Sequence, residues 1–302
     1  MVVWGGASGV AALLDRRRLD GAPVWVKPIK FTISLGIYTV TLAWLESMVT
    51  KPSLRRVGWW AGAVGAAACT FEMGLITVQA ARGRRSHFNV ATPLDSRLYL
   101  MMGLALPAFY GVTLVIGVLA AVFSRPTGDR SLVWALRSGL VIGVSGLTVG
   151  FAMGRPTPAQ RAALHPSMVG SHSVGGDDPS GGLPFLGWNT QHGDLRVAHF
   201  IGMHALQGLP LLALALRGLA GNTVSEGTRV RVVIASAAAW AALTGTALQQ
   251  ALRGLPVTRL DGVTGALLAG TGALVPLSAG AIRRHGRRTH QREQRLSRGR
   301  TP

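Results

Sequence analysis

Seven long apolar runs are the feature that most constrains how this chain can fold. Each run approaches or exceeds the roughly 20 residues that a helix needs to cross a bilayer core of about 30 Å. Backbone polar groups in lipid must be satisfied internally, and apolar runs of this length without alternation indicate helices. The runs are Ile29–Val49, Val57–Ala80, Leu98–Phe123, Leu132–Ala152, Val197–Leu216, Val230–Leu252 and Val263–Ile282. The sequence therefore predicts an all-α, polytopic transmembrane helical bundle with no soluble domain.

A shorter apolar piece, Met1–Leu14, precedes these runs. It is short for a span, and three arginines follow it rather than precede it, unlike the charge order of a secretory signal. We expect a shallow or tilted first helix, which would bring the total to eight. Residues 1–282 are then one transmembrane domain. Residues 283–302 carry eight arginines without apolar periodicity and are expected to form a disordered basic tail.

The composition narrows the class of protein. Only 14% of the residues are charged and the mean hydropathy is +0.34, whereas soluble domains carry about a quarter charged residues. The net charge of +19 points to the bilayer and its anionic lipid headgroups as partners, because no basic fold with interleaved aromatics suggests nucleic acid. Cys69 is the only cysteine, so an intrachain disulfide is excluded. The oligomeric state is left open.

The orientation is predicted from the cations. The positive-inside rule places the basic tail in the cytoplasm, and the short loops and composition suggest the plasma (inner) membrane of a bacterium. Apart from the tail, more cations fall on the opposite side, which favours a use for them beyond topology. Alternating crossings bring residues 15–30, 81–97, 154–196 and 253–261 to that extracytoplasmic face.

Histidines gather at the same face. Six of the eight lie in these loops or in the first third of the span that follows the long loop. They are His87, His165, His172, His192, His199 and His204. The long loop, residues 154–196, has a Gly/Asp/Ser-rich centre that is typical of a flexible segment. This face is therefore the expected location of a polar pocket.

The predicted span Val57–Ala80 sends further polar groups toward this face. Glu72 is the only carboxylate well inside a span, and Gln79 shares its helix face two turns later. Arg82 extends this stripe. Polar and charged groups in lipid are costly and mark functional sites by default. Predicted substrate-binding residues nearby are Lys27, Lys30, Gln79, Arg82, Asn89, Arg196 and Gln207.

The segment from Asp194 to Gln207 combines a helix start with two histidines. Asp194 is a plausible N-cap, and Arg196 and His199 share a helix face. His199 and His204 are five residues apart, which places them about 140° from each other around a helix. Glycines at 139, 143, 146, 150 and 154 form a row in the preceding span and predict close helix packing.

These residues support two main hypotheses. The first is a metal- or histidine-dependent enzyme for an amphiphilic substrate, with Glu72, His199 and His204 as catalytic groups. Its metal ligands, for zinc or iron, would be His87, His192, His199 and His204. Haem is less favoured, because only one predicted span contains histidine. The second hypothesis is binding or transport of an anionic lipid or small anion, and a membrane assembly factor is a further alternative.

A limited similarity to one family accompanies the first hypothesis. Ser86, His87, Asp95, His199 and His204 are superficially similar to the serine, aspartate and three histidines of seven-helix zinc hydrolases related to alkaline ceramidases. That similarity would imply a zinc-dependent hydrolase. The last two histidines lack the four-residue spacing expected of paired ligands. The family is therefore not assigned from the sequence.

Overall fold

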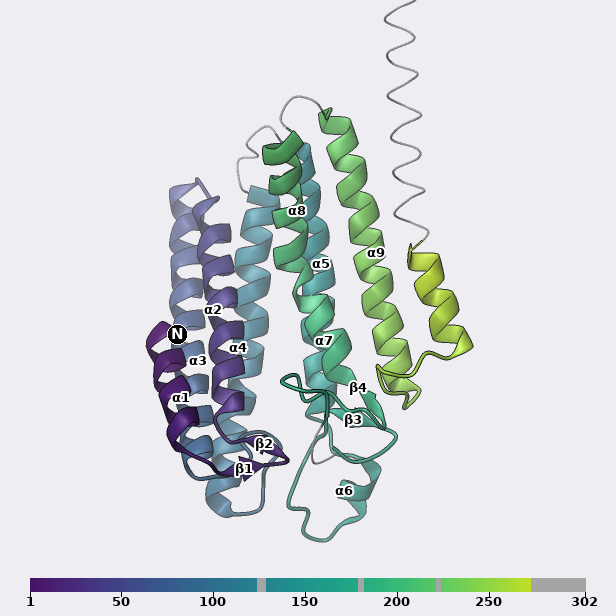
Figure 1. The fold of residues 1–302 in the computed structure, drawn as a ribbon. Helices are drawn as coiled ribbons and strands as arrows, with labels where there is room; N and C mark the ends of the chain where they lie inside the picture. Colours follow the sequence, from purple (N-terminus) through teal and green to yellow (C-terminus); the bar gives the residue numbers. More distant parts are fainter. Residues whose placement is uncertain (124–128, 179–181, 221–223, 273–302) are drawn as a thin grey trace, which may run out of the picture.

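The structure is a computed structural model that describes residues 1–123, 129–178, 182–220 and 224–272 (Figure 1). Within these residues, six helical segments are long and apolar enough to cross a membrane, with α7 and α8 together forming one of them. The helices are α2 (Val26–Ser47), α3 (Pro52–Ala81), α4 (Pro93–Phe123), α5 (Arg130–Met153), α7 (Leu195–Met203), α8 (Ala205–Ala220) and α9 (Glu226–Leu252). A helical multi-pass arrangement without a soluble domain is confirmed for the described residues.

The remaining elements are short. They are α1 (Val2–Leu14), α6 (Pro158–Ala162), the antiparallel pair β1 (Arg18–Leu19) and β2 (Ala22–Pro23), and the antiparallel pair β3 (Ser173–Val174) and β4 (Gly193–Asp194). At 1.5 Å per residue α1 is about 20 Å long, which is too short to span. Residues 262–272 are helical, but 273–282 and the tail 283–302 lie outside the described residues. The total of seven or eight spans therefore stays a prediction.

The helices begin where the local chemistry favours a start. Pro52 and Pro93 occupy the first positions of α3 and α4, where a missing N–H costs nothing. Asp129, Asp194 and Ser225 are N-caps whose side-chain oxygens accept backbone N–H bonds at the starts of α5, α7 and α9. The predicted N-cap at Asp194 is confirmed.

One predicted span is broken. Instead of a continuous helix over Val197–Leu216, α7 ends before His204 and α8 begins after it. The carbonyl of His204 accepts from both Gln207 N and Gly208 N, at 3.1 and 2.8 Å. Pro210 follows inside α8 and cannot donate to the helix ladder, which favours a bend nearby.

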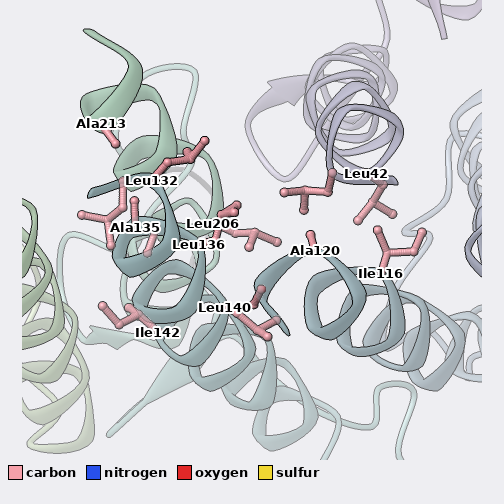
Figure 2. Close-up of a cluster of buried hydrophobic side chains, with 14 of the residues drawn as sticks. Leu42, Ile116, Ala120, Leu132, Ala135, Leu136, Leu140, Ile142, Leu206 and Ala213 are labelled. Atoms are coloured by element: carbon pink, nitrogen blue, oxygen red, sulfur yellow. The ribbon is translucent and has the colours of Figure 1, made fainter. Parts of the chain in front are cut away.

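The helices pack as two groups (Figure 1). α1 to α4 contact one another, α5 contacts α7, α8 and α9, and α4 against α5 joins the groups. Figure 2 shows the apolar cluster at this junction, where Leu42 of α2, Ile116 and Ala120 of α4, and Leu140 of α5 meet Leu206 of α8. This cluster is buried between helices, whereas side chains such as Val40 and Leu104 are exposed, as lipid-facing positions would be.

The glycine row of α5 allows the closest helix contact. A Cβ atom at Gly146 would lie 2.4 Å from Met203 N, and one at Gly202 would lie 2.7 Å from Gly146 Cα. A Cβ at Gly139 would meet Ala205 O at 2.9 Å. Only glycine fits where two backbones approach this closely, so the prediction of tight packing is confirmed.

Candidate functional site

Residues 15–25, 82–92 and the described parts of 154–194 lie together at one end of the bundle, which we call the loop end (Figure 1). Arg85 pairs with Asp20 of the β1–β2 turn at 2.5 Å, and Val169 N donates to Phe88 O at 2.8 Å. Asn89 and Met168 form an isolated β-bridge. Segments that are far apart in the sequence are thus joined into one layer, as the alternating crossings predicted.

A chain of three polar side chains runs from this layer into the bundle. Lys27 Nζ in the first turn of α2 lies 3.2 Å from His87 Nδ1. His87 Nε2 lies 3.4 Å from Glu72 Oε1 on α3. An ammonium can only donate, so His87 Nδ1 accepts and its Nε2–H faces Glu72. The other carboxylate oxygen, Glu72 Oε2, is buried and has no hydrogen-bond partner among the described residues.

Aromatic side chains surround His87 and keep it neutral. Phe31 and Phe88 lie with ring centroids 5.7 and 6.3 Å from that of His87. Burial lowers the pKa of His87 well below its ordinary value, and the positive charge of Lys27 lowers it further. At neutral pH, His87 can therefore accept a hydrogen bond at Nδ1 and donate one from Nε2.

Two more cations lie beside this chain and hold a turn of the long loop. Lys30 Nζ donates to Leu186 O at 3.2 Å, and Arg196 Nη2 donates to Gly187 O at 2.6 Å. Arg196 also pairs with the buried carboxylate of Asp194 at 2.6 Å. Both Lys30 and Arg196 interact electrostatically with Lys27. Three cations from α2 and α7 therefore converge at one place.

The described residues of the long loop, 154–178 and 182–196, are joined by many local side-chain hydrogen bonds. The Asp178 carboxylate accepts from Ser173 Oγ at 2.6 Å and lies 3.3 Å from His172 Nδ1. Burial opposes ionisation there, yet bonds from His172 and Ser173 lower the pKa of Asp178. Asn189 is fully buried and donates to Ser173 Oγ at 2.7 Å. Local polar side chains thus supply the bonds that periodic structure would otherwise provide.

His172 of this loop forms a pair that the sequence did not single out. It packs against Phe88 with ring centroids 4.8 Å apart. Burial lowers the pKa of His172, and Asp178 opposes that shift. Side chains six residues apart in a helix or a strand are too far apart to touch, so no periodic pattern marked His172 and Asp178 as partners.

Other predicted substrate-binding residues serve the loop fold. Arg82 pairs with the fully buried Asp95 at 2.7 Å, and Gln79 Nε2 donates to the same carboxylate at 3.0 Å. Asn89 Nδ2 donates to Arg85 O at 3.1 Å. These bonds join the end of α3 to the start of α4, and contact with a substrate stays a prediction for them.

The predicted catalytic histidines lie deeper, between helices. His199 Nδ1 is 2.8 Å from Gly146 O on α5, and His204 Nδ1 is 3.4 Å from Gln207 Oε1. The ring of His192 lies against Gly176 in the long loop. Within the part of the chain that the structure describes, no three His, Cys, Asp or Glu side chains form a group that could hold a metal ion. The four predicted ligands are thus not gathered into one metal site.

The arrangement can therefore bind an anion and move a proton. Lys27, Lys30 and Arg196 supply positive charge, and His87 and His172 each contact a carboxylate, which suits acid–base chemistry. Comparison with protein-family models, curated proteins and solved structures gave no match, so these side chains are the basis for the function.

Proposed function

We propose that the protein binds the anionic headgroup of an amphiphile at the loop end, on Lys27, Lys30 and Arg196. The observation that carries the proposal is that Lys30 and Arg196 donate to the neighbouring carbonyls of Leu186 and Gly187, while Lys27 lies one helical turn before Lys30 on α2. Asp194 neutralises Arg196, and Glu72 lies beyond His87 from Lys27. Lys30 has no carboxylate partner among the described residues and donates only to a carbonyl. An incoming anion would replace that weaker acceptor, because charge-assisted bonds are the stronger ones.

The surroundings favour an amphiphile over a water-soluble anion. Lys27 and Lys30 lie in the first turns of a helix of membrane length, close to where lipid headgroups would lie. The turn that covers Lys30 exposes Phe185 and Leu186, at 61% and 41%. Apolar side chains beside a cation pair suit a ligand with a charged head and an acyl chain.

Binding to the protein in zwitterionic nanodiscs tests this proposal. Lysophosphatidylglycerol should bind more tightly than lysophosphatidylcholine, and Lys30→Ala should weaken that binding about tenfold, equivalent to one charge-assisted contact. Lys51→Ala is the matched control, because Lys51 is an exposed residue before α3 at the opposite end of α2. Equal affinity for both lipids, or an equal loss in both variants, would refute the proposal.

An enzyme that acts on the bound amphiphile is the second candidate. The Asp178–His172 pair favours it, because a carboxylate on Nδ1 orients a neutral histidine to act as a general base through Nε2. His172→Gln should then abolish turnover of a bound lipid and leave its affinity unchanged. For the metal-dependent version, purified protein should contain near-stoichiometric zinc or iron that His199→Ala removes.

We also propose a topology for this function in the plasma membrane. The segment 263–282 would form a seventh span, the loop end would be extracytoplasmic, and the basic tail would be cytoplasmic. In a Cys69→Ser background, Arg84→Cys and Thr190→Cys should react with an impermeant thiol reagent on intact cells. Thr301→Cys should react only after permeabilisation. Labelling of positions 84 and 190 from different sides would contradict their shared location at the loop end.

A further inference from the structure

We propose that a proton on Glu72 controls whether Lys27 is free to bind the anion, with His87 as the switch between them. This inference rests on the proposed function and adds that the bound anion is taken together with a proton. It begins from Glu72 Oε2, a buried carboxylate oxygen that no donor and no solvent reaches in the described structure. A proton on this carboxyl group would remove the cost of a buried charge that lacks a donor at one oxygen.

The described geometry corresponds to the state in which His87 holds Lys27 and Lys27 is not free to bind the anion. The Lys27 ammonium donates to His87 Nδ1 at 3.2 Å, and His87 Nε2 lies 3.4 Å from Glu72 Oε1, within ion-pair distance. Lys27 is thereby bound within the protein. Ser86 Oγ lies 3.1 Å from the same Nδ1 and can either donate or accept.

Protonation of Glu72 would reverse the direction of proton donation along the contacts from Lys27 through His87 to Glu72. The Lys27 ammonium passes a proton to His87 Nδ1 as His87 Nε2–H passes its proton to Glu72 Oε1, and Lys27 then regains a proton from water at the loop end. The net change is one proton from solvent, which makes Glu72 a neutral acid. His87 stays neutral, but its Nδ1–H now donates to Ser86 Oγ. Two donors cannot face each other, so the Lys27 ammonium leaves Nδ1 and becomes available to the anion.

The groups around His87 support this assignment. Lys27 faces it from α2, Glu72 from α3, and His172, paired with Asp178, from the long loop. Further charges that act on Lys27 are Lys30, Arg196 and Asp20. Because cations dominate near His87, a full positive charge on its ring is disfavoured, and a change of tautomer is the cheaper response.

Calorimetric titration of the protein in zwitterionic nanodiscs, in two buffers of different ionisation enthalpy, tests the coupling. Lysophosphatidylglycerol is the probe, and inorganic phosphate is the arm that distinguishes a free anion from a lipid headgroup. Wild type should take up about one proton per bound lipid. Its affinity should fall by up to about tenfold per pH unit as pH rises, as required for a linkage of one proton. Glu72→Gln should bind without proton uptake and without this pH dependence.

Two further variants separate the switch from a structural effect. Ser86→Ala removes the acceptor for Nδ1–H, so it should weaken binding several-fold at low pH and leave binding at high pH unchanged. The exposed His165→Gln should retain proton uptake. Lipid binding without proton uptake, or uptake that persists in Glu72→Gln, would overturn the coupling alone. Absence of lipid binding at every pH would overturn the proposed function as well.

Discussion

The two helix groups bury polar side chains in different ways. In α1 to α4, buried or half-buried charges contact one another across segments, as in Arg82 with Asp95 and Glu72 with His87. Along the spans of α5 to α9, side chains bond to backbone carbonyls, as in His199 with Gly146 O and Trp240 Nε1 with Ile201 O at 2.7 Å. The buried ion pairs of this group, Arg196 with Asp194 and Arg229 with Asp129, lie at helix starts instead. Intramembrane polar residues can therefore indicate either a charged site or a helix contact, and the partner distinguishes the two.

The largest expected effect tests the packing role of the second group. Gly146→Val should destabilise the protein by about 1–3 kcal/mol or more, because its side chain would collide with the backbone of Met203 and separate α5 from α7. Unfolding in mixed detergent micelles would measure this loss. Gly74→Ala is the control, since a Cβ there meets nothing within 4 Å. Equal stability of the two variants would contradict close packing at Gly146.

A smaller loss of stability is expected at His199. From the sequence, this residue could belong either to a charged site or to a contact between helices. His199→Leu removes the bond to Gly146 O and should cost about 0.5–1 kcal/mol, the usual range for polar contacts between membrane helices. Lipid affinity and proton uptake should not change. Thr148→Val is the control, because the exposed Thr148 bonds only to its own helix. A loss of lipid binding in His199→Leu would place this residue in the site instead.

The smallest expected effect is a pH dependence of stability that arises from the histidines at the loop end. Burial lowers the pKa of both His87 and His172, so in each case the unfolded state binds the proton more readily. Their contribution is fully present above the unfolded pKa of about 6.5 and is lost as pH falls through it. From pH 7.5 to 6.5 the free energy of unfolding should fall by a few tenths of a kcal/mol per histidine.

Substitution of single histidines tests which of them causes this pH dependence of the free energy of unfolding. His172→Gln should reduce the slope, whereas His165→Gln, at an exposed position, should leave it unchanged. The pKa of Asp178 is lowered despite its burial, so this carboxylate stays ionised in the same range and adds no slope. A stability that rises toward pH 6.5 would show that these histidines gain rather than lose charge on folding.

The sequence could predict which site residues share one end of the bundle, because this depends only on how many spans separate them. Counting apolar runs is enough to place Lys27, His87 and Arg196 at one end, since each crossing reverses the chain. Helix periodicity likewise placed Glu72 and Gln79 on one face. It could not show that Gln79 would bond to Asp95 while Glu72 faced His87, because partners on other segments decide that.

The helical multi-pass bundle, the N-cap at Asp194 and the glycine contact of α5 follow from residue order, because bilayer thickness, capping and backbone approach are local or periodic constraints. Which histidine meets a carboxylate depends on how the segments pack in three dimensions. His87 lies 3.4 Å from Glu72, whereas His199, at the same end of the molecule, lies against a backbone carbonyl. A buried polar side chain takes its hydrogen-bond or ion-pair partner from the segments packed around it, and these segments are far away in the chain.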